Sequence, residues 1–186
     1  MKKFINITLV LFAALLVFSC RSDDDSIPED VHEHDEIGKV VLKLTNKADA
    51  ADVQTVSVIS GEAVGHLHLT VGSTYLAELD FQIKHDDHYH SSDEIEEEKD
   101  HHFITFGPAN ADISVLRAAN DIVRTDGQKL GLRTEWTINS TQPTGKMNIK
   151  LIHGPATVNQ NYPSATNQLG QTTGGETDVD ITVDAH

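Results

Sequence analysis

The sequence predicts an all-β protein built as an antiparallel sandwich, and three observations favour this fold class. Hydrophobic and polar residues alternate with a period of two in many short segments after residue 38. Turn residues such as Asp126-Gly127 separate these segments. Without residues 1–19, 167 of the 186 residues remain, which is enough for one domain with a modest core. We therefore expect one immunoglobulin-like β-sandwich domain over residues 37–186.

Alternation of hydrophobic and polar side chains defines the expected strands. Val40, Leu42 and Leu44 share one face of the first strand, and residues 66–71 alternate without a break. The predicted strands are residues 40–45, 53–59, 66–71, 75–84, 103–106, 113–116, 121–124, 132–138, 146–153 and 178–183.

The segments between the strands have the composition of turns and loops. Pro143-Thr144-Gly145 predicts a turn between two strands. The Glu-rich residues 92–100 suit a short solvated helix or a loop, and residues 154–175 predict a long polar loop. Trp136 and Phe81 lie in alternating strands, so we expect them in the core.

Residues 1–19 predict a cleaved leader that ends before the only cysteine of the chain. Lys2 and Lys3 precede an apolar run over residues 4–18. Because about 20 residues are needed to cross a bilayer, this shorter run is typical of a signal peptide. Val17-Phe18-Ser19-Cys20 resembles a bacterial lipobox, which implies cleavage before Cys20 and acylation of Cys20. The alternative is an ordinary secretory signal with a chance cysteine at its end.

Charge and cysteine content narrow the classes of function. The formal net charge is −15, and it becomes −17 once Lys2 and Lys3 are removed with the leader. Such a chain repels phosphates, so we expect no nucleic-acid partner and membrane attachment through the acyl group alone. With no cysteine after Cys20, the domain contains no disulfide, thiolate nucleophile or cysteine-based zinc site.

Residues 20–36 predict a disordered acidic tether. Residues 21–36 carry eight acidic residues and almost nothing that could be buried. We expect His32 and His34 to belong to this soluble spacer. The Ser-Asp-Asp-Asp after Arg21 resembles the export tag of surface lipoproteins in Bacteroidetes.

Three further segments resemble a group of small Bacteroidetes outer-membrane lipoproteins. They are Leu151-Ile152-His153-Gly154-Pro155, the Gly-Gly-Glu-Thr-Asp of residues 174–178, and the acidic residues 94–98. The resemblance implies a β-sandwich in an outer-membrane setting. Together with the lipobox and the acidic residues after Arg21, it leads us to expect a lipid-anchored protein that faces the cell surface, with the periplasmic face as the alternative. It also implies a TonB-dependent receptor as a neighbour, and it carries no activity or catalytic residue.

The chain has eleven histidines, and most of them cluster. His66 and His68 belong to one predicted strand, where residues i and i+2 project from the same face. His85, His88, His90, His101 and His102 belong to an insertion over residues 85–102 that also has eight acidic residues. His88 and His90 would repeat the strand arrangement if the strand from Tyr75 extended that far. His153 and His186 stand apart, and His153 is expected to have a structural role at a strand end.

Paired imidazoles predict a site for a divalent transition metal. Neutral imidazole suits zinc, copper and nickel, and two rings on one strand face can converge on one ion at about 2.0–2.1 Å each. We therefore expect ligands among His66, His68, His85, His88, His90, His101 and His102, with zinc first and copper or nickel as alternatives. Solvated surface histidines, or a loose chelating loop, are the simpler interpretation.

The sequence contains no catalytic motif that would indicate an enzyme. It has no Gly-X-Ser-X-Gly elbow, no phosphate-binding glycine loop and no His-Glu-X-X-His helix. The expected function is metal binding by an outer-membrane lipoprotein, accessory to a metal transporter. The alternative is a non-metal interaction module accessory to a TonB-dependent receptor. A carbohydrate-binding module comes third, because one Trp and three Tyr offer little aromatic platform.

Overall fold

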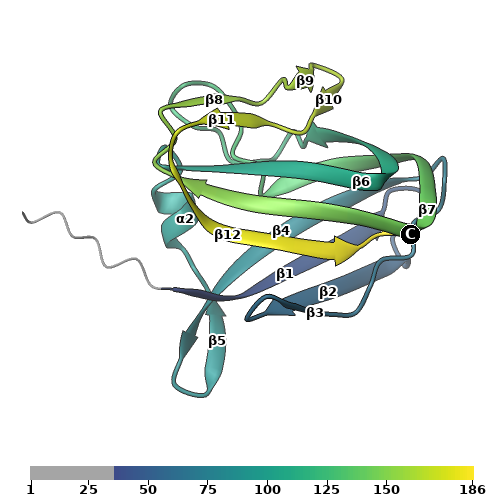
Figure 1. Cartoon of the computed structure of the whole chain (residues 1–186), viewed down its shortest axis with the longest axis horizontal. Coiled ribbons are helices and arrows are strands. Elements are labelled where there is room, and N and C mark those ends of the chain that lie inside the picture. Colours follow the sequence, from purple (N-terminus) through teal and green to yellow (C-terminus); the bar gives the residue numbers. More distant parts are fainter. Residues whose placement is uncertain (1–35) are drawn as a thin grey trace, which may run out of the picture. The chain divides into compact units, whose positions relative to one another are not determined.

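A computed structural model describes residues 36–186, which form a β-rich domain (Figure 1). The predicted all-β antiparallel sandwich is confirmed. The strands are β1 (Ile37–Asn46), β2 (Val53–Ile59), β3 (Glu62–Val64), β4 (Thr74–His85), β5 (His88–Ser91), β6 (His102–Arg117), β7 (Arg133–His153), β8 (Thr157–Asn159), β9 (Pro163–Ser164), β10 (Asn167–Gln168), β11 (Gln171–Thr173) and β12 (Glu176–Asp184), and the helix is α2 (Glu94–Glu97). The leader, Cys20 and nearly all of the tether lie outside the described residues.

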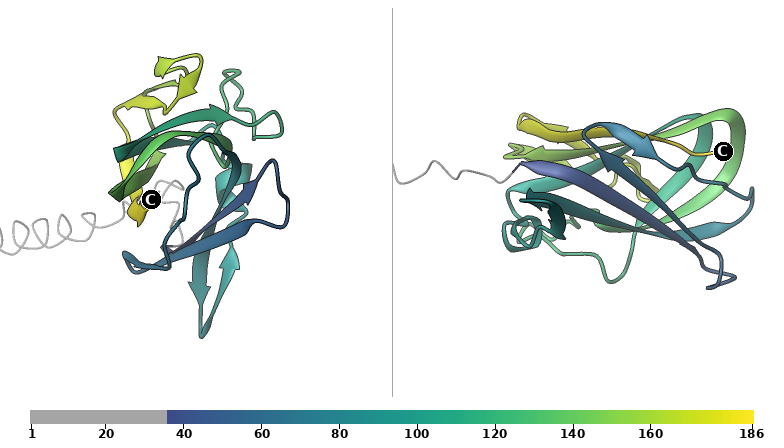
Figure 2. Two further views of the ribbon diagram at one scale, coloured as in Figure 1. Left: turned by 90° about the vertical axis from the view of Figure 1, so that its right-hand side faces the viewer. Right: turned by 90° about the horizontal axis from the view of Figure 1, so that it is seen from below.

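One continuous sheet runs through the domain. Its strand order is β12-β7-β4-β1-β2-β3, with β5 paired to β4 and β6 paired to β7. The sheet folds over on itself, so that β6 and β12 lie in one layer and β1 and β2 in the other (Figure 2). Side chains from both layers fill the space between them, including Leu42, Leu44, Val56, Ile149 and Val183.

The long strand β7 connects the two layers. Residues 133–137 pair with β4, whereas residues 146–153 pair with β12. The predicted turn at 143–145 is wrong, because these residues lie inside β7 where it passes from one layer to the other. The sequence carries a turn signal there for a different reason. A Cβ on Gly145 would collide with the carbonyl of Ala185, so glycine allows another part of the chain to approach the bend closely.

Two other segments differ from the predicted strands. Residues 66–71 form only one isolated bridge, a parallel one between Leu67 and Ala185, and Val71 already belongs to a turn. Their alternation is real, because Leu67 and Leu69 are buried while His66 and His68 are exposed. Residues 121–124 are a loop with one bridge, since Asp121 and Arg124 bond to neighbouring loops instead of a strand ladder.

The structure confirms the two predicted core aromatics and adds detail to two of the predicted loops. Trp136 and Phe81 are 0% and 2% exposed, which confirms their place in the core. The expected loop over residues 154–175 contains two small ladders, β8 with β11 and β9 with β10. The Glu-rich segment after β5 forms the single turn of α2, as one of the two expected alternatives.

The histidine-rich insertion begins with a hairpin that projects from the sandwich (Figure 1). The strand from Tyr75 ends at His85, the chain turns at Asp86, and β5 begins at His88. His88 and His90 therefore belong to a returning strand and not to an extension of β4. Within residues 36–186, no helix is long and apolar enough to cross a membrane.

Candidate metal centre

Three imidazoles gather just beyond the end of β12, and we call them the imidazole group: His66, His68 and His186. Each offers a ring nitrogen, and these nitrogens all lie within 4.8 Å of one another. The Nε2 atoms of His66 and His68 are 2.9 Å apart, so one ring donates a hydrogen bond to the other. The rings of His66 and His186 stack at 5.5 Å between centroids. The group lies at the surface, with His186 half-buried.

Backbone hydrogen bonds fix the two segments that carry the imidazole group. The amide of Leu67 donates to the carbonyl of Asp184 at 2.9 Å, and the amide of His186 donates to Leu67 at 3.0 Å. Leu69 in turn donates to the carbonyl of His186 at 2.8 Å. Residues 184–186 therefore lie beside residues 67–69 in a short parallel pairing, which brings His186 to the histidine pair.

Gln54 holds the other side of the histidine pair. Its side-chain oxygen accepts a hydrogen bond from the amide of His68 at 2.7 Å, and its side-chain nitrogen donates to the carbonyl of the same residue at 2.8 Å. This pair of bonds replaces the strand ladder that residues 66–71 lack. Since both backbone groups of His68 are bonded, its side chain is held on the outer face by a fixed backbone.

The ring nitrogens of the imidazole group lie close enough together to share one metal ion. Two ligands bound tetrahedrally at 2.0–2.1 Å lie about 3.3 Å apart, so the 2.9 Å between His66 and His68 needs only a small opening. The side chain of Asp184 is nearby, and its pKa is lowered mainly by a hydrogen bond from Lys146, with small contributions from the charges of His186 and His66. The group offers three nitrogen ligands and leaves a position open to solvent.

A second group lies at the start of β12, and we call it the mixed group: His102, His153 and Asp178. His102 and His153 are direct partners on the adjacent strands β6 and β7. The Oδ2 atom of Asp178 lies 3.9 Å from Nε2 of His102 and 3.8 Å from Nδ1 of His153. The side chain of His102 is 4% exposed, whereas those of His153 and Asp178 are 24% and 31% exposed.

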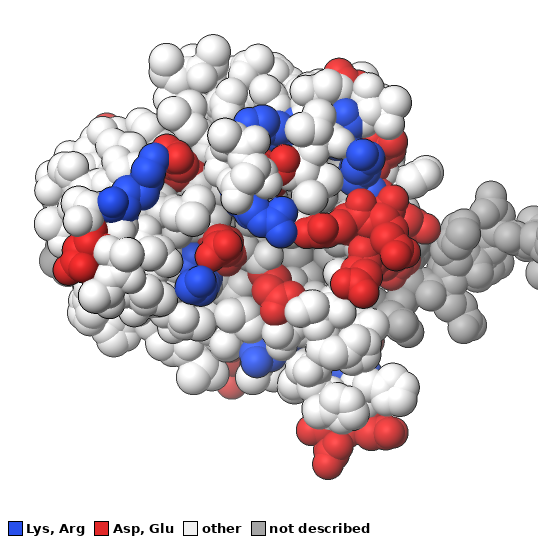
Figure 3. Space-filling view, turned by 180° about the vertical axis from the view of Figure 1, so that it is seen from behind, with Lys and Arg blue, Asp and Glu red and all other residues white. Residues whose placement is uncertain are grey.

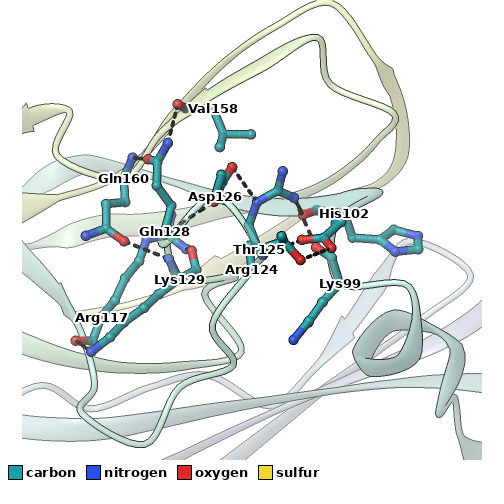
Figure 4. Close-up of polar contacts among 11 residues, drawn as sticks. Lys99, His102, Arg117, Arg124, Thr125, Asp126, Gln128, Lys129, Val158 and Gln160 are labelled. Carbon is teal, nitrogen blue, oxygen red and sulfur yellow. Dashed lines mark hydrogen bonds and ion pairs between the residues drawn. The ribbon is translucent and has the colours of Figure 1, made fainter.

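Contacts on both sides of His102 fix its position. Its Nδ1 lies 3.2 Å from the carbonyl of Glu98, which can only accept, so Nδ1 carries the proton of the neutral ring. Arg124 donates to the carbonyls of both Lys99 and His102, while the imidazole of His102 points away from the guanidinium (Figure 4). The amide of Thr125 adds a hydrogen bond to Asp100 at 2.7 Å.

Burial keeps His102 in the form that can bind a metal. Desolvation lowers the pKa of His102 below its ordinary value of 6.5 and outweighs the opposing hydrogen bond to Glu98. The neighbouring ring of His153 lowers the pKa further, and the charges of Asp178 and Glu98 raise it. The ring is therefore neutral at pH 7, with a lone pair on Nε2.

The remaining predicted ligands do not converge as closely. The rings of His85, His88 and His90 all belong to the exposed β4–β5 hairpin, with centroids 6.0 to 6.4 Å apart. They are not among the groups of described residues whose ligand atoms lie within 4.8 Å of one another. His101 is exposed, and its ring lies 6.3 Å from that of His153.

Sequence reasoning separated residues that the fold brings together. It drew candidate ligands from His66 and His68 and from residues 85–102 without choosing among them, and the structure places His66 and His68 in one group and His102 in another. It treated His153 and His186 as isolated, although each completes a group. His153 does end β7, as expected. The sequence signal for Asp178 was the Gly-Gly-Glu-Thr-Asp segment that it ends. A Cβ on Gly175 would lie 2.6 Å from the carbonyl of His153, so glycine lets this segment approach the end of β7.

Comparisons with known proteins identify no relative of this chain. No protein-family description, curated protein or solved structure matches it.

Proposed function

We propose that this protein binds a divalent transition metal through the imidazole group, with zinc as the first expectation and copper or nickel as alternatives. The observation that carries the proposal is that ring nitrogens of three imidazoles, from two chain segments, lie within 4.8 Å of one another at the surface. Neutral imidazole is the protein ligand that these three metals share. The net charge of −15 adds a long-range attraction for a dication.

We further propose that the domain is held at the outer membrane by an acylated Cys20 and faces the cell surface. The support is the lipobox-like end of the leader and the acidic residues that follow Arg21. An anchored metal-binding domain would capture the ion outside the cell and pass it to a transporter, or buffer it there. A partner such as a TonB-dependent receptor belongs to the same proposal.

Calorimetric titration with zinc tests the imidazole group. The full chain carries Cys20→Ser in every sample, so that neither a thiol nor an acyl chain contributes. We expect binding at micromolar affinity or tighter, which His66→Ala/His68→Ala abolishes and His186→Ala weakens at least tenfold. Zinc at 100 times its Kd should also stabilise the fold by about 2.7 kcal/mol, seen as a rise in Tm.

His88→Ala/His90→Ala is the matched control for this titration. It removes the same two side chains from another exposed His-X-His strand, whose rings do not converge. We expect the tight event to survive in this variant. Millimolar affinity in the parent protein, or equal affinity in both double variants, would reject the imidazole group and favour the interaction module without a metal.

A further inference from the structure

The ligand atoms of the mixed group lie within 4.8 Å of one another, which is close enough for one metal ion to be held between them. The two distances from the Asp178 oxygen, 3.9 Å to His102 and 3.8 Å to His153, are too long for hydrogen bonds. A dication bound at 2.0–2.1 Å to each atom requires about 3.3 Å between ligands. A closure of about half an ångström would bring both Asp178 distances to this ligand spacing.

The strand register places the three side chains on one side of the sheet. His102 and His153 are opposite each other on β6 and β7, and cross-strand partners project from the same face. Asp178 is the extra residue of a bulge in β12, between Thr177 and Val179. A bulge re-aims a side chain, and here it directs the carboxylate toward the two rings.

The surroundings of the mixed group prepare one ligand in advance. His102 donates its Nδ1 proton to the carbonyl of Glu98, and this kind of outer bond orients the opposite nitrogen toward a metal. Burial and the bond to Glu98 hold the ring in place, and Arg124 donates to the backbone carbonyl of the same residue, so little conformational entropy remains to be lost on binding. His153 and Asp178 are partly exposed and give an ion access to the buried nitrogen.

The charge around this end of the domain also favours a cation. The turn of α2 carries Glu94, Glu96 and Glu97, and Glu98 follows directly. The space-filling view shows a dense group of carboxylates on this side of the molecule (Figure 3). The charge of Glu98 acts directly on His102. A dication at the mixed group would gain from this field, whereas an anion would be repelled.

We propose that His102, His153 and Asp178 form a second divalent-metal site, separate from the imidazole group. Its two nitrogens and one carboxylate oxygen make it a harder ligand set, suited to zinc and to its spectroscopic substitute cobalt(II), and less suited to copper(I). The sites lie at opposite ends of β12, since eight residues at about 3.3 Å each separate Asp178 from His186 by roughly 26 Å. The second site does not depend on the proposed function of the first.

Cobalt(II) titration isolates the second site. The full chain carries Cys20→Ser and His66→Ala/His68→Ala, so that the imidazole group is absent. Visible absorption reports the geometry around cobalt, and equilibrium dialysis counts the ions. We expect one equivalent of cobalt with the intense absorption of a tetrahedral nitrogen–oxygen site. His153→Gln should remove this absorption, and Asp178→Asn should weaken cobalt binding at least tenfold.

Two controls separate coordination from general effects of charge. Asp180→Asn changes the same charge on the same strand, but Asp180 pairs with Lys150. His101→Gln removes an exposed ring close to the group. Both should leave the affinity within twofold, and circular dichroism should show that every variant is folded.

The proposal fails if cobalt shows no tetrahedral absorption. It also fails if Asp178→Asn and Asp180→Asn weaken cobalt binding equally. Should His153→Gln unfold the protein, the folded Asp178→Asn variant decides. If the zinc titration rejects the imidazole group, the cobalt result still stands, because the cobalt samples lack His66 and His68.

Discussion

At the residue scale, Asp121 shows how one carboxylate organises a loop. Its two oxygens accept hydrogen bonds from the amides of Gly131 and Arg133, at 2.7 and 3.0 Å. Desolvation lowers the pKa of the buried Arg117 to about 10, and the negative charge of Asp121 partly offsets this lowering. Arg117 donates to the carbonyls of Ile104 and Lys129, so this buried cation joins β6 to the same loop.

Asp121→Ala should destabilise the domain by about 2–5 kcal/mol, because two amides, of which that of Gly131 is buried, would lose their acceptor. Urea unfolding of the metal-free protein measures the loss. Asp93→Ala is the matched control, since this exposed side chain makes no cap bond to α2, and it should change the stability by less than about 0.5 kcal/mol. Equal losses in the two variants would contradict this role for Asp121.

His102 should make stability depend on pH in the mildly acidic range. Burial lowers its pKa in the folded state below the 6.5 of the unfolded chain, so the unfolded chain binds a proton at a higher pH. The free energy of unfolding is therefore unaffected by this group above about pH 7, and falls as pH decreases through 6.5 toward the folded pKa.

Urea unfolding in the presence of a chelator, at several pH values, measures the contribution of His102. We expect the loss of stability on acidification to be smaller in His102→Gln than in the parent protein. His101→Gln should keep the full loss, because that ring is exposed. The same pH dependence in His102→Gln and in the parent would show that another group is responsible.

At the element scale, strands were predictable where alternation matched a ladder within one sheet. Val40, Leu42 and Leu44 are buried as their spacing predicts, because this face of β1 packs into the core between the two layers. The same reasoning could not detect that β7 continues through residues 143–145. Gly145 signals a turn in sequence, but its function is to admit the backbone of Ala185, a contact between residues forty positions apart.

The two candidate sites also contain one pairing that the local pattern predicts and others that depend on long-range register. The pairing of His66 with His68 follows from the period of two and was predictable. The addition of His186 depends on a parallel pairing of residues 67–69 with the end of the chain described here. The pairing of His102 with His153 depends on the register of β6 and β7. Neither long-range register can be read from one sequence, because the local pattern is satisfied by many partners.

At the scale of the whole molecule, the proposed lipid attachment depends on one residue outside the described domain. Cys20→Ser should prevent acylation and release the protein from the membrane fraction, because the charge of −15 gives no attraction to anionic lipid. Cell fractionation and mass spectrometry of the intact protein measure this. A serine variant that remains with the membrane, together with a parent protein of unacylated mass, would disprove lipid anchoring.

Both groups depend on β12 or on the residues that directly follow it, and this has a consequence for the opening of that strand. Asp178 lies in β12 and His186 lies two residues beyond it, so neither group is complete until β12 has docked against β7. With ions bound as proposed, detachment of this strand would require the release of both. Metal supply would then set how often β12 opens, and hydrogen exchange of its amides would report the metal content of the surroundings.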